Sequence, residues 1–149
     1  MLRSSRRNWL LSGLCSFFLL FAECVQSVQL IAHESVPVTQ LSLKELRAIY
    51  TMRMDHWDQG LRIQVFTLPQ RNEVYQRFCK SVLQVLPHQL QATWYRLVFS
   101  GMGRAPVEVG DEQAMIEQVR TTPGAIGYLE KDYALSDEQQ IKVIQLQLE

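Results

Sequence analysis

From residue 28 onward, runs of the strand type alternate along the chain with segments of helical spacing. Residues 28–33 form a short apolar run, and residues 61–67 and 141–148 alternate between apolar and polar side chains. Residues 125–129 lack charged side chains, as in a strand that is buried on both faces. Strands that are separated by helices predict an α/β fold whose sheet is at least partly parallel.

Four segments are predicted to be helices. Ser42 and Glu45 fit a capping box, in which each side chain bonds to an otherwise free backbone N–H group, so a helix is expected to begin at Ser42. Pro87 suits the first turn of another helix. Helices are predicted at residues 42–51, 72–83, 87–98 and 111–119. A chain of 149 residues with this organisation is expected to form one domain.

Residues 1–27 have the composition of a secretory signal peptide. Arg3, Arg6 and Arg7 precede an apolar run at residues 9–22. That run is shorter than the roughly 20 residues that a membrane-spanning helix needs. We therefore expect export to the periplasm and a mature domain of residues 28–149, which would meet the membrane only through the signal peptide before cleavage.

The cleavage site and the fate of the apolar run have alternatives. Sites for cleavage end at Ser27 or at Cys24. The run could also stay as an uncleaved anchor, or Cys24 could be acylated in a lipoprotein. Glu23 counts against a lipoprotein, because a small residue is wanted before the acylated cysteine. After cleavage at Ser27 only Cys79 remains, so no internal disulfide can form, and Cys79 is expected to be a buried apolar side chain.

Charge is balanced in total but unevenly distributed. The chain has 15 Lys and Arg against 15 Asp and Glu. Residues 41–104 hold nine basic and four acidic side chains, whereas residues 105–149 hold three basic and nine acidic ones. This balance does not suggest a nucleic-acid partner. A small ligand of the first half is expected to be an anion, with a solvated basic face as the alternative.

Several motifs, in their order along the chain, resemble those of type II periplasmic solute-binding proteins of the phosphate group. The motifs are a helix that ends in an aromatic residue, a loop with a tryptophan and a glycine, a strand, and two later markers. They lie at residues 41–50, at Trp57 and Gly60, at residues 62–69, at residues 94–103 (with Leu-Val-Phe-Ser-Gly at 97–101) and at residues 123–128 (Pro-Gly-Ala-Ile-Gly-Tyr). The last marker is the most specific, and the resemblance covers about residues 28–146.

The resemblance implies a fold and a function. Full-length members of that family have two α/β lobes with an anion in the cleft between them. Residues 28–149 suffice for one core but not for two. We therefore expect a single lobe with a mixed sheet flanked by helices, which lacks half of the cleft. The implied function is binding of phosphate or another oxyanion, with a transporter or another envelope protein as partner and without a cofactor.

Oxyanions bind at helix N-termini, where free backbone N–H groups and the helix dipole favour negative charge. The turn at residues 68–74 predicts such a site. In the family, an arginine and a Ser-Gly-Thr turn lie here. Alignment on the helical phenylalanine, Phe78, puts Pro69 at the arginine and the residues Asn72, Glu73 and Val74 at the turn. None of the four matches.

Neighbouring residues offer replacements for these groups. Gln70, Arg71 and Asn72 are the predicted ligand-binding residues, because they can supply hydrogen bonds and a cation. His33 is added as a lining residue, since it ends the first strand at the kind of sheet edge where ligands bind. Glu73 opposes this prediction, because its carboxylate would repel an anion. A normally capped helix without a ligand is the alternative.

Other chemistry is not indicated. His33, His56 and His88 lack the spacing of metal ligands, and no catalytic triad or phosphate loop stands out. We expect neither a metal nor an enzyme. Two functions remain open: an oxyanion-binding module that a partner or a second copy completes, and a degenerate lobe that recognises another protein in the cell envelope.

Overall fold

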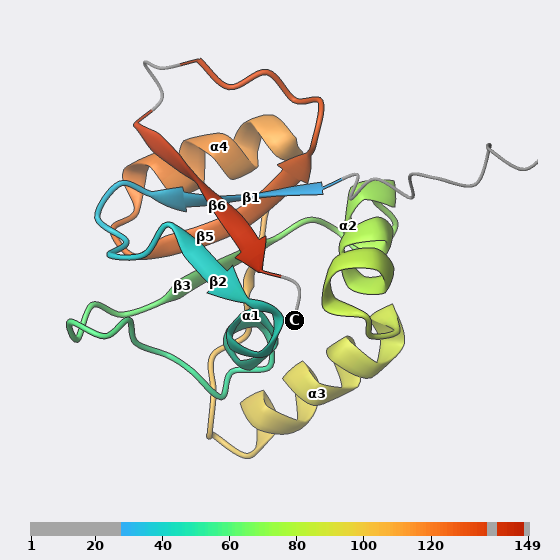
Figure 1. Cartoon of the computed structure of the whole chain (residues 1–149). Helices are drawn as coiled ribbons and strands as arrows, with labels where there is room; N and C mark the ends of the chain where they lie inside the picture. The colour runs from blue at the N-terminus through green and yellow to red at the C-terminus, as the bar shows by residue number, and fades with distance from the viewer. Residues whose placement is uncertain (1–27, 137–139, 148–149) are drawn as a thin grey trace, which may run out of the picture.

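The structure is a computed structural model that describes residues 28–136 and 140–147, so the predicted signal peptide lies outside the described residues (Figure 1). The strands form one six-stranded sheet in the order β2-β6-β1-β5-β3-β4. They are β1 (Val28–His33), β2 (Gln40–Ser42), β3 (Gln64–Thr67), β4 (Val107–Glu108), β5 (Ala125–Glu130) and β6 (Ile141–Gln147).

The sheet is mixed, as predicted. Strand β3 is parallel to β4 and β5, and β2 is parallel to β6. Strand β1 lies between β5 and β6 and is antiparallel to both. The helices are α1 (Leu43–Tyr50), α2 (Glu73–Arg77), the π-helix η1 (Phe78–Leu83), α3 (Pro87–Phe99) and α4 (Glu112–Thr121). The expected single α/β lobe with flanking helices is therefore confirmed.

Helices cover both faces of the sheet, and β5 is buried between them (Figure 1). On one face, Gly127 of β5 lies so close to α4 that an added Cβ would be 2.5 Å from the sulfur of Met115. On the other face, the ring of Tyr128 stacks on that of Phe78 in η1 with centroids 3.9 Å apart. Tyr50 of α1 meets the same phenylalanine edge-on at 4.7 Å. This aromatic cluster ties α1 and η1 to the central strand.

Several local predictions are confirmed. The capping box of α1 is present, with Ser42 and Glu45 bonded to each other's backbone N–H groups. From the positions of Trp57 and Trp94 at the ends of elements, we also expect these indoles to pack in the core. Both side chains are buried and donate hydrogen bonds to the carbonyls of Gly124 (3.1 Å) and Tyr50 (2.7 Å), respectively. Cys79 is buried as well.

Other elements differ from the predictions. The helix expected at residues 72–83 is α-helical only to Arg77 and then continues as the π-helix η1. Strands β2 and β4 were not predicted, because segments of three and two residues at the sheet edges show no period. In the part of the chain that the structure describes, no helix combines the length and hydrophobicity needed to cross a membrane.

Candidate functional site

The turn of residues 68–74 connects β3 to α2, and β5 fixes its beginning. The backbone N–H of Leu68 donates to the hydroxyl of Tyr128 at 3.0 Å, and Oγ1 of Thr67 lies 3.0 Å from the same oxygen. Burial raises the pKa of the Tyr128 hydroxyl well above its ordinary value. The hydroxyl therefore stays neutral and holds the beginning of the turn through these hydrogen bonds.

The turn brings Gln70, Arg71 and Asn72 together with free hydrogen-bond donors. Asn72 is the N-cap of α2, and its Oδ1 accepts the N–H of Val74 at 2.8 Å. Its side-chain NH2 group remains available. Among the described residues, no hydrogen-bond partner is present for the backbone N–H groups of Gln70, Arg71 and Glu73, and no ion pair holds the exposed Arg71. The three predicted ligand-binding residues thus face solvent from one turn.

A series of charged side chains leads from this turn to the end of β5. Glu73 pairs with Arg77, whose Nη1 lies 3.5 Å from Oε2 of that glutamate. Arg77 also pairs with Glu130 at the end of β5. The backbone N–H of Glu130 in turn donates to Oε1 of Glu112 at 2.5 Å. With Arg71, two guanidinium groups face three carboxylates, so the edge has no excess of positive charge. Sequence reasoning missed Arg77, although its spacing of four residues from Glu73 is the signal for such a pair.

His33 does not join this group, because it lies at the opposite end of the sheet. Ala32 pairs with Ile126 at the beginning of β5, and this end of β5 pairs with the beginning of β3. The turn of residues 68–74 instead follows the end of β3. Nδ1 of His33 is 2.8 Å from Oγ of Ser35, and this oxygen accepts the N–H of Gly124 at 3.0 Å. His33 therefore belongs to the turn after β1, and Ser35 bonds this turn to Gly124 just before β5.

The described residues contain no group of three or more His, Cys, Asp or Glu side chains that could hold a metal ion. His56 contacts Asp55, with its Nδ1 2.9 Å from Oδ1. This hydrogen bond lowers the pKa of the Asp55 carboxyl, and Arg62 lowers it further by charge attraction. Asp55 is therefore ionised at neutral pH.

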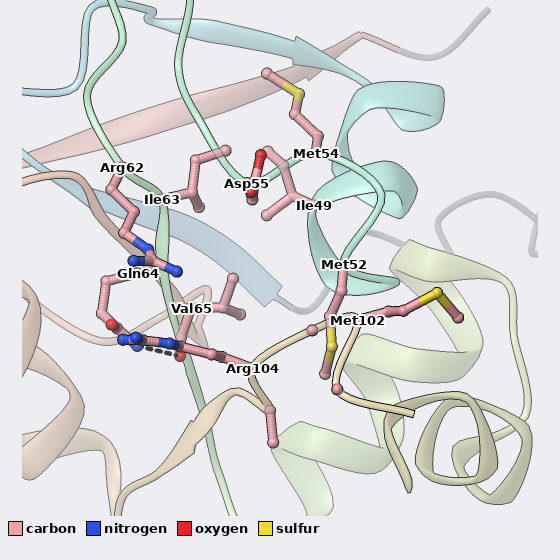
Figure 2. Close-up of a pocket in the computed structure, with 13 residues that line it drawn as sticks. Ile49, Met52, Met54, Asp55, Arg62, Ile63, Gln64, Val65, Met102 and Arg104 are labelled. Carbon is pink, nitrogen blue, oxygen red and sulfur yellow. Dashed lines mark hydrogen bonds between the residues drawn. The ribbon is translucent and has the colours of Figure 1, made fainter. Parts of the chain in front are cut away.

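A pocket of about 250 Å³ opens at the beginning of β3, at the other end of that strand from the turn (Figure 2). We call it the methionine pocket. Its lining comes from the end of α1 and the following loop, from residues 62–65, and from the loop after α3. The apolar lining includes Ile49, Met52, Met54, Ile63, Val65 and Met102, and the polar lining includes Asp55, Arg62, Gln64 and Arg104.

Two cations of the methionine pocket lie on the same side. Figure 2 shows the guanidinium groups of Arg62 and Arg104 next to the side chain of Gln64. Sequence reasoning missed this pocket, because 42 positions separate the two arginines in the numbering and only the chain path after α3 brings them together. No motif marks them.

Solved structures with a similar fold belong to phosphate transport. PstS from Borrelia burgdorferi matches with a TM-score of 0.65 and 18% identity, over 80% of this chain and 47% of that one. An ABC-type phosphate transport receptor from Vibrio cholerae matches with a TM-score of 0.62 and 18% identity, over 80% and 46% of the two chains. A substrate-binding protein from Clostridium perfringens, solved with bound phosphate, matches with a TM-score of 0.63 and 17% identity, over 80% and 44%.

These matches confirm the expected fold. The chain has the fold of phosphate-type periplasmic binding proteins but spans less than half the length of these three structures. No family model and no curated protein matches the sequence. At 14–18% identity, the likeness concerns the fold and carries no residue roles.

Proposed function

We propose that this protein is an exported solute-binding module that binds an inorganic oxyanion, with phosphate as the first candidate, at the turn of residues 68–74. One observation carries the proposal: the turn presents free backbone N–H groups at Gln70, Arg71 and Glu73 beside the unpaired guanidinium of Arg71. The turn lies where β3 ends, and open α/β sheets bind their ligands at this edge of parallel strands. One similar structure contains phosphate.

Each polar group of this turn has a separate role in the proposed site. The N–H groups and the Arg71 guanidinium supply charge-assisted hydrogen bonds to the anion oxygens. Asn72 uses its oxygen as the helix cap and keeps its NH2 group as a further donor. Arg77 offsets the repulsive charge of Glu73. The proposed partner that faces this turn is a second copy of the chain or an envelope protein such as a transporter.

Isothermal titration of phosphate and of sulfate into the purified protein, at low and at moderate salt, tests this site. We expect saturable binding that weakens as salt rises. Arg71→Gln should weaken it by about tenfold, since a hydrogen bond to a charged group contributes about 1.5–3 kcal/mol. Asn72→Asp should abolish binding without unfolding the protein, because the aspartate keeps the cap oxygen but adds a negative charge.

Arg53→Gln serves as the matched control, because Arg53 is exposed and lies in the loop after α1, away from the turn. It should bind phosphate as the unchanged protein does. The absence of heat with either anion, from protein that circular dichroism shows to be folded, would contradict the oxyanion site. If Arg53→Gln and Arg71→Gln weakened phosphate binding equally, the binding would be a general effect of charge and not a site at the turn.

A second candidate function is that of a protein-interaction module in the cell envelope. It is favoured by large apolar side chains on and after α3 that face solvent: Phe99 is 87% exposed, Met102 72% and Tyr95 59%. Such clustered exposure is typical of surfaces that bind other proteins. The carboxylates near the turn also favour this second function, because they would repel an anion. A folded protein without oxyanion binding would turn the search to this surface.

Export is proposed from the sequence of residues 1–27. The mass of the protein recovered from the periplasm of an expressing bacterium tests it. A chain that begins at Val28 would support cleavage by signal peptidase. A chain that keeps residues 1–27 and stays with the membrane would support an uncleaved anchor, and a diacylated Cys24 would support a lipoprotein.

A further inference from the structure

We propose that the methionine pocket binds a small carboxylate that carries an apolar chain of a few carbon atoms. The pocket lies at the beginning of β3, whereas the proposed oxyanion turn follows the end of that strand. It is therefore a separate site, and its ligand need not be the solute proposed above.

The apolar part of the pocket lining is adaptable. Ile49 and Ile63 are buried beneath it. Met52 packs so closely on the loop after α3 that a Cβ at Gly103 would lie 2.7 Å from its sulfur. Met54 also lines the pocket, whereas Met102 lies at its rim, 72% exposed, with its side chain extending away from Arg62 and Val65 (Figure 2). Methionine side chains are flexible and polarizable, so they fit chains of different shape.

The charges of the pocket favour an anionic group at one side. The side chains of Arg62 and Arg104 form no hydrogen bond or ion pair with any described residue. The single carboxylate in the lining is that of Asp55, which His56 already engages at 2.9 Å. Two guanidinium groups thus face one partly satisfied carboxylate. A guanidinium binds a carboxylate through two parallel hydrogen bonds, which fits both free arginines (Figure 2).

The size and polarity of the pocket narrow the ligand class. Its volume of about 250 Å³ is below the roughly 300–1,000 Å³ of sites for drug-sized ligands. A small acid fits such a space. Inorganic phosphate could contact the arginines but would leave the apolar side chains of the lining without a partner. A carboxylate with a short hydrocarbon chain places its charge on the arginines and its chain on the isoleucine and methionine side chains.

Methionine methyl groups report on this pocket directly. The chain has five methionines: Met52, Met54 and Met102 line the pocket, Met115 is fully buried under β5, and Met1 precedes the described residues. The purified protein, labelled with 13C at the methionine methyl groups, is titrated with hexanoate, with hexanol and with phosphate. We expect hexanoate to shift the pocket methyl signals in a saturable manner and to leave that of Met115 unchanged. Hexanol and phosphate should bind at least about tenfold more weakly, because each lacks one half of the interaction.

Variants assign the charge contacts. Arg62→Gln and Arg104→Gln should each raise the dissociation constant of hexanoate by about tenfold. The control is Arg71→Gln, because Arg71 lies in the turn after the other end of β3 and is not part of the pocket lining. The proposal is overturned by absent or unsaturable shifts, by hexanol or phosphate binding as tightly as hexanoate, or by indifference to both variants. Arg71→Gln should not affect hexanoate, so this test and the phosphate titration can fail independently.

Discussion

At the residue scale, Gly124 joins three segments of the chain. Its N–H donates to Ser35 at 3.0 Å, and its carbonyl accepts the indole of Trp57 at 3.1 Å and the N–H of Gln64 at 3.2 Å. Its φ is +75°, and a Cβ here would lie 2.1 Å from the carbonyl oxygen of Arg62. Any larger residue at Gly124, the first glycine of the Pro-Gly-Ala-Ile-Gly-Tyr marker, would therefore clash with the backbone.

Replacing Gly124 by alanine should destabilise the protein by more than the left-handed backbone alone explains. Gly60→Ala is the matched control, because Gly60 has a φ of +78° and nothing within 4 Å of its added Cβ. The control should lose about 1–2 kcal/mol, the cost of that conformation for an L residue. Gly124→Ala should lose about 1–3 kcal/mol more through the clash with backbone. Urea unfolding measures both values, and equal losses would show that the clash relaxes.

The candidate site was predictable only where its residues are neighbours in sequence. Gln70, Arg71 and Asn72 share one turn, and a turn between a strand and a helix can be recognised locally. The distance from His33 to that turn depends on the order of the strands, which the sequence pattern does not contain. The same holds for Arg62 and Arg104, whose meeting depends on the path of the chain after α3.

At the element scale, η1 shows what hydrophobic spacing leaves open. The apolar positions of residues 72–83 predict a helix, and they are buried in one. The end of the π-helix is held by a side chain of another helix. Arg47 of α1 donates its Nε–H to the carbonyl of Leu83 at 2.8 Å and an Nη2–H to Oε1 of Gln84 at 2.9 Å. A contact between elements that are 36 positions apart has no local signal.

The buried thiol of η1 should make stability depend on alkaline pH. Burial raises the pKa of Cys79 from 9.0 to about 11, so unfolding releases a proton between these values. Its contribution is fully present below about pH 9 and is lost as pH rises towards 11. Urea unfolding of the protein and of Cys79→Ala from pH 8 to 10 should show a steeper loss in the unchanged protein.

The variant is needed because Tyr50, Tyr75 and Tyr128 are buried as well, and burial raises their pKa values in the same direction. Their contribution remains in Cys79→Ala and can be subtracted. Reaction with a thiol reagent at pH 8 gives a second check, because a neutral buried thiol should react only after unfolding. Rapid labelling of the folded protein would contradict the burial of Cys79.

At the scale of the whole molecule, the packing of the lobe bears on how it unfolds. Its core is continuous through the sheet, since β5 contacts α4 on one face and η1 on the other. Edge strands β2 and β4 are only three and two residues long, which limits pairing with other chains. Both observations favour one cooperative unit.

We therefore expect two-state unfolding, and two tryptophans can test it. In the chain from Val28 onward, Trp57 and Trp94 are the only tryptophans. The first bonds to Gly124 at the beginning of β5, and the second links α3 to α1 through Tyr50. In Trp57→Phe and in Trp94→Phe, the fluorescence of the remaining indole should change at the same urea concentration as the far-UV circular dichroism of that variant. If the Trp94 signal changed at a lower urea concentration, α3 would unfold separately from the rest of the lobe. That result would favour the protein-interaction function, in which a partner covers the exposed apolar side chains of α3.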